Sequence, residues 1–110
     1  LSYDENAIFN SIRNIFNTKP GEKILNPAFG LDLSQYLFEP ISEETAREIG
    51  NAVLEQLPLY EPRVILNSID IVAKENNNEY IVTMSITVPE LNNLYTDIKG
   101  VLDTQGFRYN

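Results

Sequence analysis

The sequence predicts an α+β fold: a small single domain over residues 1–110, with two helices packed on an antiparallel β-hairpin and a further C-terminal helix or strand. Two segments, residues 5–17 and 43–57, place apolar residues at helical spacing. A third, residues 80–88, alternates apolar and polar residues, as a strand covered mainly on one face does. At 110 residues the chain can bury one hydrophobic core but not two.

The first predicted helix begins at about Glu5 and is capped by Asp4, whose side chain can accept a hydrogen bond from a free amide of the first turn. Pro20 and Gly21 are expected to end it. We expect its apolar stripe to pack on the domain's own core, and docking onto another subunit is the alternative. The stripe consists of Ile8, Ile12, Ile15 and Phe16.

Residues 21–40 show no sustained period, because prolines and a glycine interrupt any regular element. One or two helical turns are expected within residues 31–38. We interpret the remainder as an ordered loop pinned by apolar side chains. These are Phe29, Leu33 and Phe38.

The second predicted helix runs from Glu43 to about Leu57, with Ser42 as its cap. Gly50 weakens this helix by about 1 kcal/mol relative to Ala. Its presence is compatible with close approach of a neighbouring backbone. Pro58 is expected to stop the helix. Its predicted buried side consists of Ala46, Ile49, Val53 and Leu57.

Two strands are predicted next, at residues 63–73 and 80–88. The apolar positions of the first change parity, which indicates either that both faces are covered or that a bulge lies near Asn67 and Ser68. Between the strands, residues 75–79 are rich in Asn, which tolerates positive φ. This pattern predicts an antiparallel hairpin.

The C-terminal segment is expected to form another helix after Pro89, since its apolar residues fit a helical stripe. Gly106 is the predicted stop, and residues 107–110 then form a tail with the pattern of a short strand. The stripe consists of Leu91, Leu94, Tyr95, Ile98, Val101 and Leu102.

The composition argues against many classes of function. The net charge is −8, and binding of nucleic acid depends on Lys and Arg to displace counterions, so we expect no nucleic-acid partner. Without Cys or His, the chain has no thiol nucleophile, thiolate zinc site or imidazole base. The apolar runs are far shorter than a membrane span, and the start lacks a secretion-signal pattern. We therefore expect no membrane contact, no metal and no cofactor.

The remaining enzymatic possibility is a pair of carboxylates that cleave a sugar bond as acid and base. Four acidic residues in the non-periodic regions are the candidates for such a pair. The chain has no Trp to form an aromatic sugar platform. A peptidoglycan hydrolase is thus the alternative function, and the expectation is that the protein is not an enzyme. The candidates are Glu22, Asp32, Glu39 and Glu61.

The triplet Glu61-Pro62-Arg63 separates the second helix from the first strand. Proline fixes its own φ and forces Glu61 into an extended conformation. Residues two apart in an extended segment point the same way, which places the carboxylate beside the guanidinium. The simpler interpretation is a connector with an exposed ion pair worth about 0–1 kcal/mol.

A second motif runs from Pro20-Gly21-Glu22 through residues 26–33 to Leu37-Phe38-Glu39. Together with the triplet, it resembles the baseplate wedge family that initiates the sheath of contractile phage tails. That family is related to the baseplate component of bacterial type VI secretion systems and has carried a lysozyme-like label. In it, the Glu-Pro-Arg triplet is a hallmark near contacts within the wedge, so the resemblance implies partner binding by Glu61, Pro62 and Arg63.

The resemblance implies a structural role, in which the protein joins the wedge core to the first sheath ring by β-strand addition. The expected partners are the tail sheath protein and other baseplate wedge proteins, within a large hetero-oligomeric assembly. The expected location is the virion's tail baseplate, after assembly in the host cytoplasm. We expect the predicted hairpin to accept the added strand at Thr83 and Ser85. A baseplate component of a bacterial injection system is a further alternative.

Overall fold

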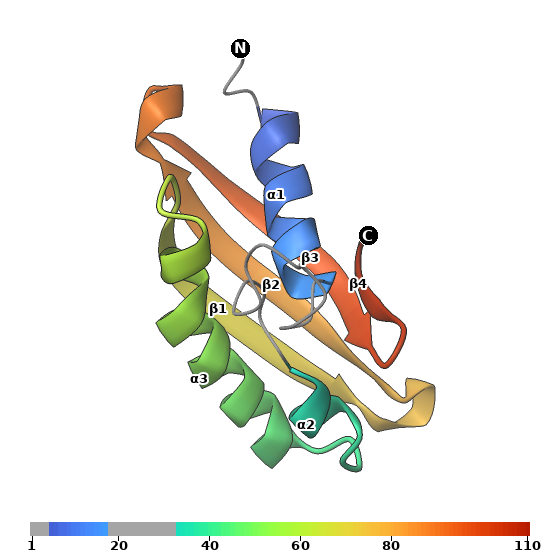
Figure 1. Ribbon diagram of the computed structural model, residues 1–110. Coiled ribbons are helices and arrows are strands. Elements are labelled where there is room, and N and C mark those ends of the chain that lie inside the picture. The colour runs from blue at the N-terminus through green and yellow to red at the C-terminus, as the bar shows by residue number, and fades with distance from the viewer. Residues whose placement is uncertain (1–4, 18–32) are drawn as a thin grey trace, which may run out of the picture.

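The computed structural model describes residues 5–17 and 33–110, which form one helical layer on one antiparallel sheet (Figure 1). The strand order is β1-β2-β3-β4, so each strand pairs with the next one along the chain. The helices are α1 (Glu5–Asn17), α2 (Ser34–Leu37) and α3 (Glu43–Tyr60). The strands are β1 (Ile65–Lys74), β2 (Glu79–Val88), β3 (Leu94–Asp103) and β4 (Gly106–Tyr109), with single 3-10 turns η1 (Glu75–Asn77) and η2 (Pro89–Leu91).

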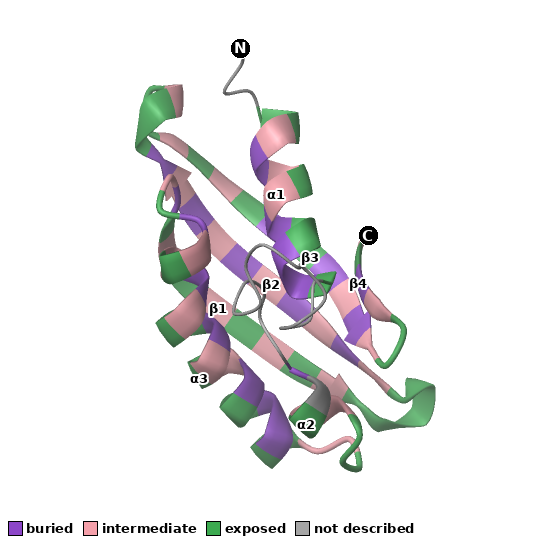
Figure 2. Cartoon of the chain, viewed as in Figure 1, coloured by how far each residue is buried: buried purple, intermediate pink, exposed green. Residues whose placement is uncertain are grey.

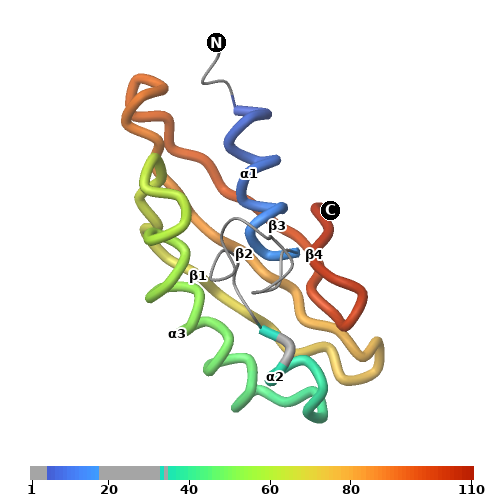
Figure 3. Tube along the Cα trace, in the orientation of Figure 1, coloured from blue at the N-terminus to red at the C-terminus, as the bar shows by residue number. Residues whose placement is uncertain are grey.

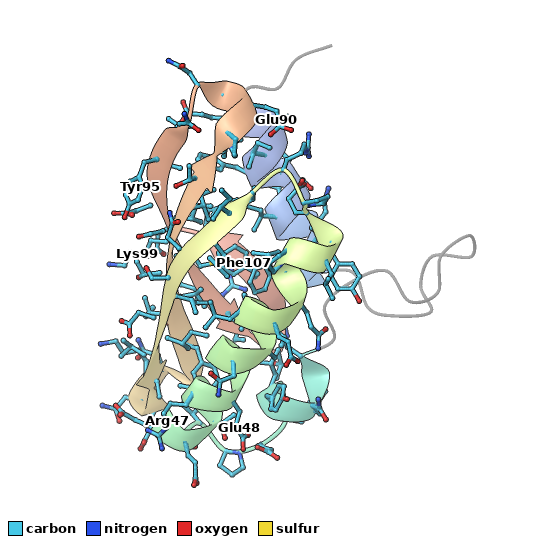
Figure 4. The ribbon with its side chains drawn as sticks, turned by 90° about the vertical axis from the view of Figure 1, so that its left-hand side faces the viewer. Arg47, Glu48, Glu90, Tyr95, Lys99 and Phe107 are labelled. Atoms are coloured by element: carbon cyan, nitrogen blue, oxygen red, sulfur yellow. The ribbon has the colours of Figure 1, made fainter. Side chains whose placement is uncertain are left out.

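The α+β class is confirmed, and the two long helices lie on the same face of the sheet. α3 packs on β1 and α1 packs on β4. In the side view of Figure 4 the sheet and the helices form separate layers, and Tyr95 and Lys99 point away from the helices. One face of the sheet therefore carries the core, while the other is free of helices in the described part of the chain.

α1 has the bounds that the sequence predicts, and its apolar stripe is buried in the domain's own core, as expected. Ile8, Ile12 and Ile15 are each about fully buried, and Phe16 stacks on Phe107 of β4 with ring centroids 4.7 Å apart. The predicted cap Asp4 and the predicted stop Pro20-Gly21 lie outside the described residues. Docking of this stripe onto another subunit is excluded by its burial here.

The single turn of α2 confirms the short helix expected within residues 31–38. Leu33 is buried, so it anchors the segment, and the Tyr36 and Leu37 amides donate to its carbonyl oxygen. The expectation that Phe38 pins the loop is wrong, because its side chain is 76% exposed at the end of this turn. Phe29 lies outside the described residues.

α3 is capped as predicted, because the Ser42 hydroxyl accepts a hydrogen bond from the Thr45 amide at 3.1 Å. The predicted inner side is also confirmed: Ala46, Ile49, Val53 and Leu57 are buried. The helix does not stop at Pro58 but continues to Tyr60. Pro58 has no N–H, so one backbone hydrogen bond is missing near the end of the helix, and the Glu61 amide closes the last turn by donating to the Leu57 carbonyl oxygen at 2.9 Å.

The predicted hairpin is formed by β1 and β2, and the change of parity is a bulge between Leu66 and Ser68. The inward-facing residues of β2 are almost fully buried, as the colouring of Figure 2 shows. In the turn, Asn78 has φ of 57°. The inward-facing residues are Tyr80, Val82, Met84, Ile86 and Val88.

The predicted C-terminal helix is wrong, since residues 94–103 form β3 along the free side of β2. Asn92 and Asn93 both have positive φ, which turns the chain back after η2. Gly100 is required in β3, because a Cβ there would lie 2.5 Å from the Arg108 carbonyl oxygen. The short C-terminal strand is confirmed as β4, which pairs with the end of β3. The trace in Figure 3 shows this continuous meander.

Candidate partner-binding site

The Glu61-Pro62-Arg63 triplet forms a closed ion pair at the corner between α3 and β1. Arg63 Nε donates to Glu61 Oε1 at 2.8 Å, and Arg63 Nη2 donates to Glu61 Oε2 at 2.8 Å. The Arg63 amide also donates to Oε1 at 3.3 Å. The side-by-side arrangement expected from the sequence is therefore present, and it has the bidentate geometry that only arginine can make.

The pair is not the exposed connector of the simpler interpretation. Glu61 is 3% exposed, whereas the Arg63 side chain is 29% exposed. The Ser11 hydroxyl of α1 also donates to Glu61 Oε2, which ties the first helix to this corner. Burial alone would raise the pKa of Glu61, but the hydrogen bonds from Arg63 and Ser11 and the charge of Arg63 hold the pKa below its ordinary value. The carboxylate is thus ionised and fixes the guanidinium at the surface.

Thr83 and Ser85 lie in β2, which is a central strand. Thr83 is paired with Asp70 of β1 on one side and with Lys99 of β3 on the other. The expectation that a partner strand pairs with β2 at these two residues is wrong, because β3 already occupies that position. Their side chains face the helix-free side of the sheet, where the Ser85 hydroxyl donates to Asp97 at 2.8 Å.

The sheet has its long edge at β1. The Lys99 carbonyl accepts from the Asn110 amide at 3.1 Å, so the Lys99 backbone points away from β2. In an antiparallel sheet the backbone N–H and C=O groups of successive residues point to alternate sides of the strand. Lys99 is paired with Thr83, and Thr83 with Asp70, so the backbone groups of Asp70 point toward β2. The backbone groups of Ile69, Ile71 and Ala73 consequently point outward. Figure 4 looks onto this edge, with β1 in front and no other described element lying over it.

A groove runs beside the middle of this edge, between α3 and β1. It is lined on the helix by Ala46, Arg47, Gly50, Asn51 and Leu54. On the strand it is lined by Ile69, Asp70 and Ile71. The bulge before Ser68 and the charged Lys74 limit the regular part of the edge to residues 68–73, and the groove lies within that part.

The opposite edge, at β4, is closed by α1. The Asn17 side chain accepts from the Phe107 amide at 2.8 Å and donates to the Phe107 carbonyl oxygen at 3.2 Å. The Tyr109 hydroxyl donates to the Phe9 carbonyl oxygen of the same helix. Burial raises the pKa of Tyr109 to about 12, so this hydroxyl keeps its proton. One carboxamide thereby satisfies both outward groups of Phe107, as a neighbouring strand would.

A family model described as baseplate wedge protein gp25 matches residues 2–105. The chain belongs to the gp25 family. It is 29% identical over 82 residues to baseplate wedge protein gp25 of Enterobacteria phage T4, a region that spans 74% of this chain and 62% of the T4 protein. The match therefore covers less than two thirds of that relative's length.

Two solved structures share the fold. One is a crystal structure of a protein from Geobacter sulfurreducens provisionally called a tail lysozyme, with 31% identity, a TM-score of 0.77 and coverage of 90% of this chain and 89% of that one. The other belongs to the baseplate of the anti-feeding prophage, with 26% identity, a TM-score of 0.68 and coverage of 77% and 69%. The chain is thus related in sequence to a phage wedge protein and shares its fold with a component of the anti-feeding prophage baseplate.

The acidic candidates for catalysis are divided among different environments. Glu61 is bound by Arg63 and Ser11, as described above. Glu39 is exposed and accepts a hydrogen bond from the Thr45 hydroxyl at 3.3 Å. Glu22 and Asp32 lie outside the described residues, as does Gly30 of the second motif. Within residues 5–17 and 33–110 no cluster of three metal-ligating side chains occurs, and no helix there is long and apolar enough to cross a membrane.

Two residues that organise the corner and the β4 edge, Ser11 and Asn17, were not predicted from the sequence. Ser11 is a polar residue between apolar positions of α1, and no local pattern connects it to a carboxylate fifty residues away. Asn17 ends the same helix, and its partner is ninety residues distant. Gly50 was noted as a place of close approach, but the neighbour is the side chain of Ile71 rather than a backbone.

Proposed function

We propose that this protein is a structural component of a contractile-tail baseplate that joins the wedge core to the first sheath ring. In this role a strand of the tail sheath protein pairs with the β1 edge. The observation that carries the proposal is that the β1 edge combines outward backbone groups with an open groove between α3 and β1. The proposal replaces β2 by β1 as the accepting strand.

The wedge-facing contact is assigned to the Glu61-Pro62-Arg63 corner, together with other baseplate wedge proteins. The bidentate pair and Ser11 hold the guanidinium in one orientation, with the Arg63 side chain 29% exposed at this corner. Thr83 and Ser85 remain candidates for side-chain contacts on the helix-free face of the sheet. The location that follows is the virion's tail baseplate, assembled in the host cytoplasm.

The role is not enzymatic in this proposal. Arg63 keeps the Glu61 carboxylate ionised. The general acid of a glycosidase must donate a proton, and an ionised Glu61 has none to donate. The family relation to the anti-feeding prophage baseplate supports an equivalent role in a bacterial injection machine as the alternative. Neighbouring genes for phage tails or for secretion distinguish these two settings.

Ala73→Pro tests the proposed edge. The Ala73 amide points outward, so proline removes a hydrogen-bond donor from the edge and places its ring in the path of an added strand. The hydrogen bonds between β1 and β2 are kept. We expect the variant to melt close to the wild type but to lose nucleation of the sheath protein of the same tail. The measurement is sheath polymerisation on assembled wedges, followed by electron microscopy.

Thr83→Pro is the contrasting variant, since its backbone groups are used within the sheet. We expect it to unfold the domain, because a central strand tolerates no proline. A folded Ala73→Pro protein that nucleates sheath at the wild-type rate would show that strand addition at β1 is wrong.

A further inference from the structure

The β1 edge has features that select among extended segments. We propose that the groove between α3 and β1 recognises a positively charged strand that places one apolar side chain over Gly50. This inference rests on the strand addition proposed above, and it specifies the chemistry that the added strand must carry.

Apolar surface on the helix side of β1 is incompletely covered. Ile69 and Ile71 face the helices and are only half-buried. Their paired residues on β2, Met84 and Val82, are 0% exposed. The difference arises because β1 has no strand on its outer side in the described chain. A strand added there would complete the burial of both isoleucines.

The space above this surface is left open by a glycine. A Cβ built on Gly50 would have Ile71 Cδ1 as its nearest neighbour, at 3.9 Å, which is an ordinary contact with no clash. Leu54, one turn further along α3, is 45% exposed and forms one wall of the groove. Because an added strand points every second side chain toward the helices, one of them lies over Gly50.

Charge on this side of the molecule determines the sign of the partner. The lining of the groove itself carries one cation, Arg47, and one anion, Asp70, whereas the rest of the exposed surface of α3 carries four acidic residues. Figure 4 shows Arg47 and Glu48 at the lower end of α3, with Arg47 on the side that faces β1. With a chain charge of −8, the field here attracts a cationic segment. The acidic residues of α3 are Glu43, Glu44, Glu48 and Glu55.

Gly50→Leu and Gly50→Ala form a matched pair that tests the groove. Both replacements improve helix propensity, so both proteins are expected to fold. Leucine fills the groove, whereas the methyl of alanine fits the free space. The probe is a short fluorescent peptide that alternates valine with lysine, and its binding is measured by anisotropy with the Ile69–Ala73 amides followed by NMR.

We expect the lysine peptide to bind the wild type and the alanine variant within about twofold of each other. The leucine variant should bind it about tenfold more weakly, which corresponds to about 1.4 kcal/mol. A peptide that alternates valine with glutamate should bind more weakly than the lysine peptide, and the gap should narrow at high salt.

Equal binding by the leucine and alanine variants, or equal binding of the two peptides, would overturn the proposal. If Ala73→Pro abolishes sheath nucleation while Gly50→Leu leaves peptide binding and nucleation unchanged, strand addition stands and the groove inference fails. If neither variant affects nucleation, the proposed edge function itself fails.

Discussion

Replacing Glu61 by Gln removes the charge of the Glu61-Arg63 pair with little change in side-chain volume. The carboxylate accepts from Arg63 Nε and Nη2 at 2.8 Å each, and also from Ser11. In the variant an amide nitrogen must face one of these donors, so at least one close contact joins two donors. The guanidinium then has no countercharge within its own triplet.

The expected cost follows from the burial of the two partners. Removing one partner of a buried ion pair costs about 3–5 kcal/mol. Because the Arg63 side chain is 29% exposed, water solvates part of the guanidinium charge that Glu61 no longer balances, and we expect a loss of about 2–3 kcal/mol. For a domain of this size, a change of 1 kcal/mol shifts the melting temperature by about 4 °C, so the shift should be about 8–12 °C.

The loss should depend on pH with a defined sign. The pKa of Glu61 is lowered in the folded protein, so its ionised form contributes stability above the unfolded pKa of about 4.3. That contribution disappears as the pH falls through the lowered folded pKa. The difference between wild type and Glu61→Gln should thus be full at about pH 7 and shrink below about pH 4.

Urea unfolding at several pH values measures this difference, and Glu39→Gln is the control because that carboxylate is exposed. The control should change stability by less than about 1 kcal/mol. The reasoning is refuted if Glu61→Gln melts within about 2 °C of the wild type at neutral pH. A difference that persists undiminished in acid would assign the effect to packing rather than to charge.

Asn17→Ala should destabilise the domain by about 1–2 kcal/mol and speed hydrogen exchange of the Phe107 amide, while Asn10→Ala on the exposed side of α1 should do neither. Unchanged exchange would show that Asn17 does not protect the edge. The purified protein should not clear a peptidoglycan suspension beyond a heat-killed control. Clearing that is abolished by Glu39→Gln would show that the chain is an enzyme after all.

The elements that were predictable from the sequence are those whose apolar residues repeat with the spacing of only one type of secondary structure. α1 and α3 repeat apolar residues at helical spacing, and β2 alternates apolar and polar residues except at Ile81. The C-terminal segment was ambiguous, since Leu94, Ile98 and Leu102 are four residues apart. A spacing of four places residues on one face of a helix and also on one face of a strand, because four is a multiple of two. The decisive signal was the Asn92-Asn93 turn.

The error in that segment carried over to the site. With β3 read as a helix, β2 was expected to have a free side, and the accepting residues were placed on it. The Glu61-Arg63 contact was predictable because it depends only on proline and a two-residue repeat. Its burial was not predictable, because that depends on Ser11 and α1, which reach the triplet only through tertiary packing.

The contact between α1 and β4 has a consequence for synthesis of the chain. Asn17 and Phe107 are ninety residues apart, and Phe9 and Tyr109 are one hundred apart. The sheet, in contrast, is a series of adjacent hairpins that close over short loops. On the ribosome the first helix therefore emerges long before the strand that receives it. Its apolar stripe lacks its β4 partner until the last strand is released, so we expect nascent α1 to need protection during synthesis.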